Sequence, residues 1–286
     1  MHDFEFHAPD SIEGAVELLS NYGDNARVIA GGTALTTMMK QSLVQPEHLV
    51  SLHRVLGVNY IESRDDVLCI GALSTHRDVE TSSVVQSWAP LLSEAYKRVA
   101  TVRIRNVATV GGGLAHADPA QDPPPSLLLL NANVHLISGS GNRTVPISEF
   151  FSDYYETAVK DGELIKEVTI DRQPSQGKSV YMKFLPRTED DYATVSVAAI
   201  GSVDSGVITD VRLALGAVAP TAIRVPEVES SLLGVPPEPG TIRQAVEKIA
   251  DLVDPMDDFR GSADYKRSMA VVFARRALEN VLGVSE

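Results

Sequence analysis

The chain has 286 residues, of which 44% are hydrophobic and 22% charged, the composition of an ordinary globular protein. Its 25 basic and 38 acidic side chains give a net charge of −13, which argues against binding of the whole molecule to nucleic acid or to an anionic membrane. Cys69 is the single cysteine, so the chain forms no internal disulfide and cannot alone ligate an iron–sulfur cluster or a cysteine-type zinc ion.

The N-terminal residues do not resemble a secretory signal peptide, because they are acidic and lack a basic region followed by an apolar core. No uncharged apolar run approaches the roughly 18 residues that a membrane span requires. We therefore expect a soluble protein of a reducing compartment, the cytoplasm if the chain is bacterial.

The first 55 residues predict alternating strands and helices. Phe4 and Phe6 alternate with acidic residues as in a short strand, and Asp10 and Glu13 are spaced as a capping box for the helix that follows. Further strands are predicted at 27–30 and 49–52, with a helix at 33–41 between them. This order predicts a small right-handed parallel unit.

From Val58 onward the pattern changes to short strands joined by hairpins. Predicted strands cover 58–61, 67–70, 133–137, 144–147 and 164–170, with a turn at Arg64–Asp66 and helices at 74–84 and 91–99. The polar stretch 171–177, which contains Pro174 and Gly177, predicts a linker.

The remaining chain predicts an antiparallel meander followed by two or three helices. Its strands are expected at 180–185, 193–203 and 207–218, with a turn at Asp204–Gly206. Gly283 follows the last helix as a C-terminal cap. The predicted domains are 1–173, with subdomains of about 1–55 and 56–173, and 178–286.

Two glycine clusters, Ala30–Leu35 and Thr109–Pro119, stand out. Glycines at a strand end let a phosphate approach the backbone, and a following helix offers free N–H groups. Neither cluster is a P-loop, and His116 stands where a dinucleotide fingerprint has its third glycine. Tight turns and a nucleotide site remain equal alternatives.

Charged residues add two observations. The stretch before the second cluster contains no acidic residue but four basic ones, Lys97, Arg98, Arg103 and Arg105. This pattern predicts either a patch that attracts a phosphate or an acidic partner, or a solvated helix face. The seven histidines show no metal-binding motif along the sequence, so no metal site is expected.

Four collinear segments resemble the flavin subunit of the molybdenum hydroxylases, the family of xanthine dehydrogenase and aerobic carbon monoxide dehydrogenase. They are Ala30–Leu35, Arg103–Gly112 together with Ala115–Asp122, the stretch from Lys183 through Arg187 and Glu189 to Ala193, and Asp258–Arg267. The resemblance implies an α+β fold, with a two-subdomain FAD-binding domain (PCMH-type) followed by a C-terminal domain of antiparallel sheet plus helices. Thr33 and Ala34 stand where covalent flavoproteins carry a histidine, which implies non-covalent FAD.

The resemblance also implies cofactor-binding residues, and no catalytic or metal-binding residue, in this chain. The loops Val28–Leu35 and Thr109–Gly113 would cradle the pyrophosphate and ribityl chain, with a hydroxyl from Thr109, although many relatives have asparagine at Gly113. Asp118 and Asp122 would accept hydrogen bonds from flavin or ribose hydroxyls, Lys183 would approach the flavin, Tyr192 would face it, and Leu164 or Ile165 would pack under the ring. The expected set is Val28, Ile29, Ala30, Gly31, Gly32, Thr33, Ala34, Leu35, Thr109, Gly111, Gly112, Gly113, Ala115, His116, Asp118, Asp122, Leu164, Ile165, Lys183 and Tyr192.

The implied partners are a large subunit with a molybdopterin cofactor and a small subunit with two [2Fe–2S] clusters, assembled as a dimer of heterotrimers. Electrons would pass from the clusters through FAD to an acceptor that the sequence does not name: NAD, a quinone, a cytochrome or oxygen. Two alternatives remain open. One is a stand-alone FAD-dependent reductase of the same superfold, similar to the UDP-N-acetylenolpyruvoylglucosamine reductases, and the other is a scaffold module that has lost the cofactor.

Overall fold

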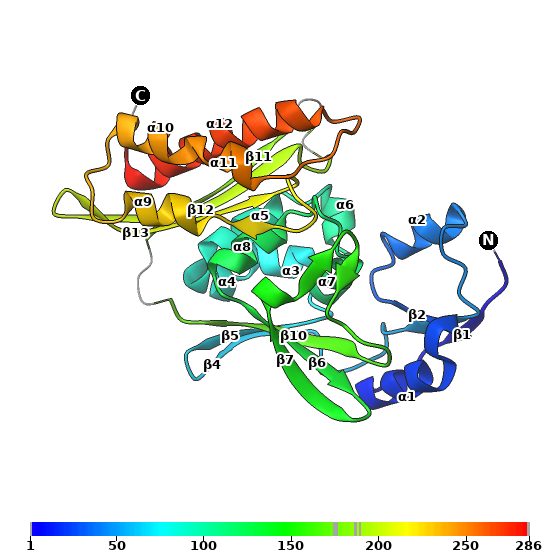
Figure 1. The fold of residues 1–286 in the computed structure, drawn as a ribbon. Helices are drawn as coiled ribbons and strands as arrows, with labels where there is room; N and C mark the ends of the chain where they lie inside the picture. The colour runs from blue at the N-terminus through cyan, green and yellow to red at the C-terminus, as the bar shows by residue number, and fades with distance from the viewer. Residues whose placement is uncertain (1, 174–176, 186–187, 189, 285–286) are drawn as a thin grey trace. The chain divides into compact units, whose positions relative to one another are not determined.

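The computed structural model describes residues 2–173, 177–185, 188 and 190–284. They form two compact units that alternate along the chain (Figure 1). The first unit comprises Met1–Val84, Thr101–Ala117 and Ala132–Asp171, and the second comprises Val85–Ala100, Asp118–Asn131 and Arg172–Glu286.

A three-stranded parallel sheet opens the first unit. Its strands are β1 (Glu5–His7), β2 (Ala26–Ile29) and β3 (His48–Ser51), in the order β1-β3-β2, connected by α1 (Ile12–Tyr22), the 3₁₀ turn η1 (Gly23–Asn25) and α2 (Leu35–Lys40). Ala15, Val16 and Leu19 of α1 share a core with Val50 of β3. The predicted parallel pairing of these strands is confirmed. The predicted capping box is wrong by one residue, because Ser11 caps α1 by accepting the Gly14 N–H at 3.2 Å.

A five-stranded antiparallel sheet forms the second part of this unit. In spatial order its strands are β4 (Ile61–Arg64), β5 (Val67–Gly71), β10 (Leu164–Asp171), β6 (Asn133–Ser138) and β7 (Gly141–Pro146). Asp65 and Asp66 have φ angles of 45° and 64°, the conformation of a two-residue hairpin turn. That turn fixes the register, so β4 begins at Ile61, where the predicted strand 58–61 was expected to end.

Short elements complete the first unit. They are α3 (His76–Thr81), α6 (Val102–Arg105), α7 (Val110–His116), η2 (Ile147–Glu149), β8 (Phe151–Asp153) and β9 (Glu156–Thr157), while α4 (Ser83–Trp88) crosses the limit between units. The predicted single helix 74–84 is wrong. Ser82, with ψ of 120°, ends α3 after a capping box made by Thr75 and Asp78.

The second unit consists of an antiparallel sheet with helices packed on both of its faces. The sheet contains β11 (Lys178–Phe184), β12 (Val195–Asp204), β13 (Val207–Gly216) and β14 (Ile223–Arg224), and its helices are α5 (Pro90–Lys97), α8 (Pro123–Leu129), α9 (Pro226–Leu232), α10 (Pro239–Glu247), α11 (Ile249–Leu252) and α12 (Ala263–Leu282). Val195 and Val197 of β12 pack in the core with α12, whereas Ala198 and Ile200 pack with α5 and α8. Successive side chains of a strand point to opposite faces, so β12 supplies both cores.

The predicted meander is confirmed. Ser205 and Gly206, with φ angles of 51° and 82°, form the turn between β12 and β13, and Gly283 ends α12 in a left-handed conformation. Four helical segments follow the sheet within the described residues, where two or three were expected. The limits 1–173 and 178–286 remain predictions, and residues 174–176 of the predicted linker lie outside the described residues.

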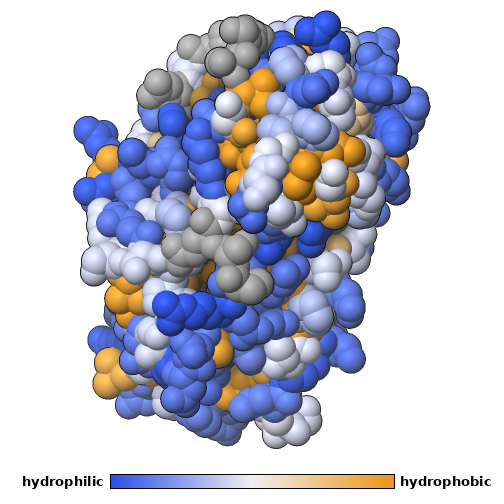
Figure 2. All heavy atoms as spheres, turned by 90° about the vertical axis from the view of Figure 1, so that its left-hand side faces the viewer, coloured by the Kyte–Doolittle hydropathy of each residue, from blue (hydrophilic) through white to orange (hydrophobic). Residues whose placement is uncertain are grey.

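No described helix is long and apolar enough to cross a membrane. On the face shown in Figure 2, hydrophilic residues predominate and hydrophobic ones form separate patches.

Candidate functional site

The first unit brings the two glycine clusters together. A Cβ built at Gly31 would lie 1.9 Å from the carbonyl oxygen of Val107, and one built at Gly112 would lie 3.9 Å from the Cβ of Ala30. Only a residue without a side chain fits at Gly31. The loop that follows β2 therefore lies against the segment that joins α6 to α7.

The loop Ala30–Ala34 presents a run of backbone donors. Among the described residues, no acceptor is found for the N–H groups of Gly31, Gly32, Thr33 and Ala34. Gly32 has a φ of 69°, and its carbonyl oxygen accepts the N–H and the hydroxyl of Thr36 at 3.1 and 2.6 Å. Consecutive free N–H groups in such a turn form a concavity that binds anions. These four N–H groups are available as donors to an anionic ligand.

The second cluster behaves differently, because it lies inside the short helix α7. The N–H groups of Val110 and Gly111 donate to the carbonyl oxygens of Ser74 and Ala72 at 3.0 and 2.8 Å. That of Gly112 donates to the Thr109 hydroxyl at 3.2 Å. The expectation of free N–H groups at this helix start is therefore wrong. Thr109 still has its hydroxyl proton to donate.

Close packing explains the glycine at position 111. A Cβ at Gly111 would lie 2.7 Å from the Cβ of Ala72, so this residue lets α7 approach the segment after β5. A side chain at Gly111 would thus clash with the protein itself, whether or not a ligand were bound.

The other predicted residues of the first unit surround these loops unevenly. Ala115 is exposed, and the ring of His116 lies 5.4 Å from that of Tyr155. Leu164 and Ile165, at the start of β10, are buried, and Leu164 belongs to the core beneath α1.

In the second unit, Asp122 and Lys183 form a buried ion pair. Lys183 Nζ donates to Asp122 Oδ2 and to the Arg98 carbonyl oxygen, both at 2.9 Å, and the Tyr181 hydroxyl donates to Asp122 Oδ1 at 2.6 Å. The side chains of Lys183 and Asp122 are only 3% and 4% exposed. Both carboxylate oxygens therefore have protein donors, and a ligand contact by Asp122 remains a prediction.

Burial sets the electrostatics of this cluster. Desolvation raises the pKa of Asp122 to about 6, although Lys183 and Tyr181 both favour the ionised form. Burial and the adjacent carboxylate also raise the pKa of Tyr181 well above its usual value. Sequence reasoning missed Tyr181, although it lies two residues before Lys183 on the same face of β11.

The remaining predicted residues of the second unit have local roles or stay untested. Asp118 accepts the Ala120 N–H at 2.9 Å in a turn. Tyr192 is exposed, and Arg187 and Glu189 lie outside the described residues.

The predicted basic patch is partly used by internal ion pairs. In the first unit Arg105 is buried and donates to Glu80 at 2.8 Å. In the second unit Lys97 and Arg98 lie 3.8 and 3.1 Å from Glu94. Arg103 is exposed.

Comparison with known proteins covers nearly the whole chain. Residues 2–172 match the FAD binding domain in molybdopterin dehydrogenase, and residues 180–281 match the CO dehydrogenase flavoprotein C-terminal domain. The carbon monoxide dehydrogenase medium chain of Hydrogenophaga pseudoflava is 36% identical over 96% of each chain. The glyceraldehyde dehydrogenase medium chain of Sulfolobus acidocaldarius is 31% identical over 98% of each chain.

A solved structure agrees with these matches. A carbon monoxide dehydrogenase structure from Hydrogenophaga pseudoflava superimposes with a TM-score of 0.95 at 35% identity, covering 100% of this chain and 99% of that one. The resemblance seen in the sequence motifs is therefore confirmed. The chain belongs to the family of FAD-binding medium subunits of the molybdopterin-containing dehydrogenases.

Proposed function

We propose that this chain holds FAD without a covalent bond and passes electrons from two [2Fe–2S] clusters of a small partner subunit to an external acceptor. The observation that carries the proposal is the run of free N–H groups at Gly31–Ala34, held against the segment that precedes α7. An acidic chain needs such neutral donors to hold a diphosphate, because its overall field repels anions.

The residues around this loop fit FAD. The N–H groups of Gly31–Ala34 and the Thr109 hydroxyl would hold the diphosphate. Positions 33 and 34 are threonine and alanine, so neither carries a histidine or cysteine side chain to which the flavin could be attached covalently. The Asp122–Lys183–Tyr181 cluster fixes α8 and β11 of the second unit in place. A contact of Asp122 or Lys183 with FAD stays a prediction of the family resemblance.

The chain lacks the cysteines that iron–sulfur clusters need as ligands, so we assign the clusters to a partner subunit. Cys69 is a single buried cysteine, so iron–sulfur clusters must be ligated elsewhere. Bound FAD can store two electrons and exchange them one at a time. The protein binds and orients the flavin and tunes it electrostatically. Two relatives of similar identity are named for carbon monoxide and for glyceraldehyde. We infer that the partner subunit with the molybdopterin cofactor selects the substrate.

The native complex, purified through a tag on this chain, tests the proposal. We expect close to one FAD released by acid per chain, with iron–sulfur absorption and molybdenum in co-purifying subunits. Native mass spectrometry should show a dimer of heterotrimers, and cell fractionation should place the complex in the cytoplasm. A lone flavin-containing chain that oxidises NAD(P)H with a small acceptor would indicate a stand-alone reductase instead. A purified chain without flavin would indicate a scaffold.

A matched pair of variants tests the loop itself. Thr33→Asp adds a negative charge beside the free N–H groups, whereas Thr33→Asn adds a neutral side chain of the same size. Coulomb repulsion of about 1.4–2.8 kcal/mol should weaken FAD binding roughly 10- to 100-fold in the aspartate variant relative to the asparagine variant. Fluorescence titration of the apo chain with FAD measures the ratio. Equal FAD affinities of the two variants would show that the diphosphate does not bind at this loop.

A further inference from the structure

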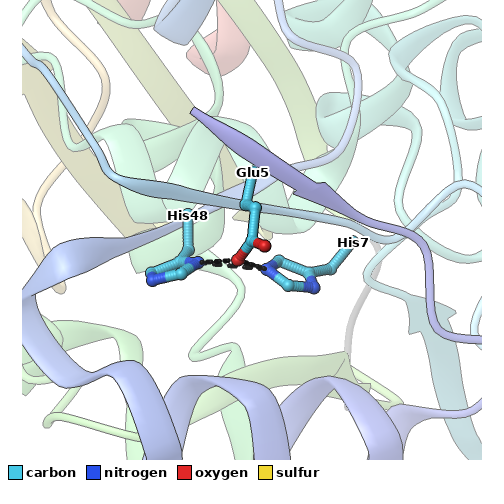
Figure 3. A group of neighbouring side chains, drawn as sticks. All are labelled: Glu5, His7 and His48. Carbon is cyan, nitrogen blue, oxygen red and sulfur yellow. Dashed lines mark hydrogen bonds and ion pairs between the residues drawn. The ribbon is translucent and has the colours of Figure 1, made fainter. Parts of the chain in front are cut away.

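Three side chains, those of Glu5, His7 and His48, lie close together in the parallel sheet, around the first residue of β3 (Figure 3). Glu5 and His7 are two residues apart on β1, so they lie on the same face of the sheet. His48, the first residue of β3, is the registered partner of Glu5. Pairing of the two strands therefore assembles one carboxylate and two imidazoles that are far apart in sequence.

The donor atoms converge on one another. His48 Nδ1 lies 3.1 Å from His7 Nε2 and 3.1 Å from Glu5 Oε2, and the distance from His7 Nε2 to Glu5 Oε2 is 3.7 Å. Zinc–ligand bonds of about 2.0–2.2 Å in a tetrahedron place neighbouring ligand atoms roughly 3.3–3.6 Å apart. The three distances lie close to this range, so small adjustments bring all three atoms to bonding distance of one ion.

The surroundings hold the two rings in place. The ring of Tyr22, the last residue of α1, stacks on His48 with centroids 3.6 Å apart and on His7 at 5.2 Å. The histidine side chains are 20% and 17% exposed, whereas Glu5 is 70% exposed. The imidazoles are thus preorganised, and the carboxylate side remains open to an ion and its water.

We propose that Glu5, His7 and His48 bind a divalent transition-metal ion of the zinc type, with water completing its coordination. Two imidazole nitrogens and one carboxylate oxygen suit zinc, whereas calcium and magnesium prefer oxygen donors alone. The bound ion fastens the three-residue strand β1 to β3. Sequence reasoning expected no metal site because the histidines form no metal-binding motif along the chain. The two histidines of this cluster are 41 residues apart, and only strand pairing brings them together.

The site is separate from the proposed FAD loop. His48 also pairs with Ala26, the first residue of β2, whereas the loop Ala30–Ala34 follows Ile29, the last residue of that strand. The two sites therefore lie at opposite ends of β2. Metal binding is expected to stabilise the sheet and to leave the FAD content unchanged.

Calorimetric titration of the full chain with ZnCl₂, after treatment with EDTA, tests the proposal. We expect one zinc ion per chain, and a melting temperature that rises with zinc concentration because the ion binds the folded state. His48→Gln and Glu5→Gln should each weaken zinc binding by more than about 10- to 100-fold, the usual cost of losing a supporting residue alone. His53→Gln, which replaces an exposed histidine outside the cluster, serves as the control.

Glu5→Gln keeps the shape of an exposed side chain, so it reports on coordination even if His48→Gln disturbs the fold. The absence of saturable zinc binding would overturn the proposal and leave a hydrogen-bonded histidine pair. Unchanged affinity in both cluster variants would overturn it as well. FAD content measured in the same samples separates this outcome from a failure of the proposed function.

Discussion

Replacing Gly31 by alanine tests whether the contact between the two glycine-containing segments is required for FAD binding. The added Cβ would lie 1.9 Å from the carbonyl oxygen of Val107, 2.6 Å from its carbonyl carbon and 3.0 Å from the Cα of Ala108. Non-bonded heavy atoms prefer separations of about 3.5–4.0 Å, so the segments must move apart by more than about 1 Å. Overpacking of this kind costs about 1–3 kcal/mol.

Two measurements follow for this variant. Its melting temperature should fall by roughly 2–4 °C for each kcal/mol lost. Its FAD content should fall well below that of the parent protein, because the loop with the free N–H groups is displaced.

Gly139→Ala is the matched control, since its Cβ would meet only the Val16 Cγ1 atom at 3.9 Å. Both variants are assayed by thermal unfolding and by acid-released flavin per chain. If Gly31→Ala matched Gly139→Ala in both assays, the inferred contact would be refuted.

Three further predictions concern the second unit. Lys183→Met leaves Asp122 buried without its cation and should lower the free energy of unfolding in urea at pH 7 by about 3–5 kcal/mol; adding Asp122→Asn should restore most of this loss, and an unrestored double variant would contradict the pairing. The folded pKa of Asp122, about 6, lies above the unfolded value of about 3.9. The contribution of Asp122 to the free energy of unfolding is therefore fully present below about pH 4, and it is lost as the pH rises through about 6. In the Asp122→Asn variant, the free energy of unfolding in urea should depend less on pH between about pH 4 and 6. A pH dependence identical to that of the parent protein would disprove the raised pKa of Asp122. Ser262→Ala removes the cap that accepts the Tyr265 N–H at the start of α12 and should cost about 1 kcal/mol in the same assay, more than Ser268→Ala within the helix.

Local chemistry allowed much of the fold to be predicted. Asp65–Asp66 and Ser205–Gly206 were recognisable as turns because such residues tolerate positive φ angles. The errors arose where neighbouring residues offer equal local signals. Asp10 and Ser11 are both good helix caps, and the structure uses Ser11.

The candidate site was predictable only in part. The first glycine loop carries its proposed function in consecutive residues, so its motif was visible in the sequence. Hydrogen bonding of the second cluster to Ala72 and Ser74 depends on tertiary packing, which no local pattern reports. The same holds for Asp122 and Lys183, whose 61-residue separation is closed by the fold.

The alternation of the two units along the chain has a consequence for synthesis. Helices α5 and α8 emerge from the ribosome before the sheet whose face they cover. Their apolar residues Leu91, Ala95 and Leu129 gain their first strand partner only when Tyr181 has been made, and Ala198 and Ala214 follow later. A nascent chain that stops within the polar stretch 171–177 therefore carries uncovered apolar helices. Premature termination there should yield an aggregation-prone product rather than a working flavin module, so the C-terminal sequence is needed to complete elements encoded far upstream.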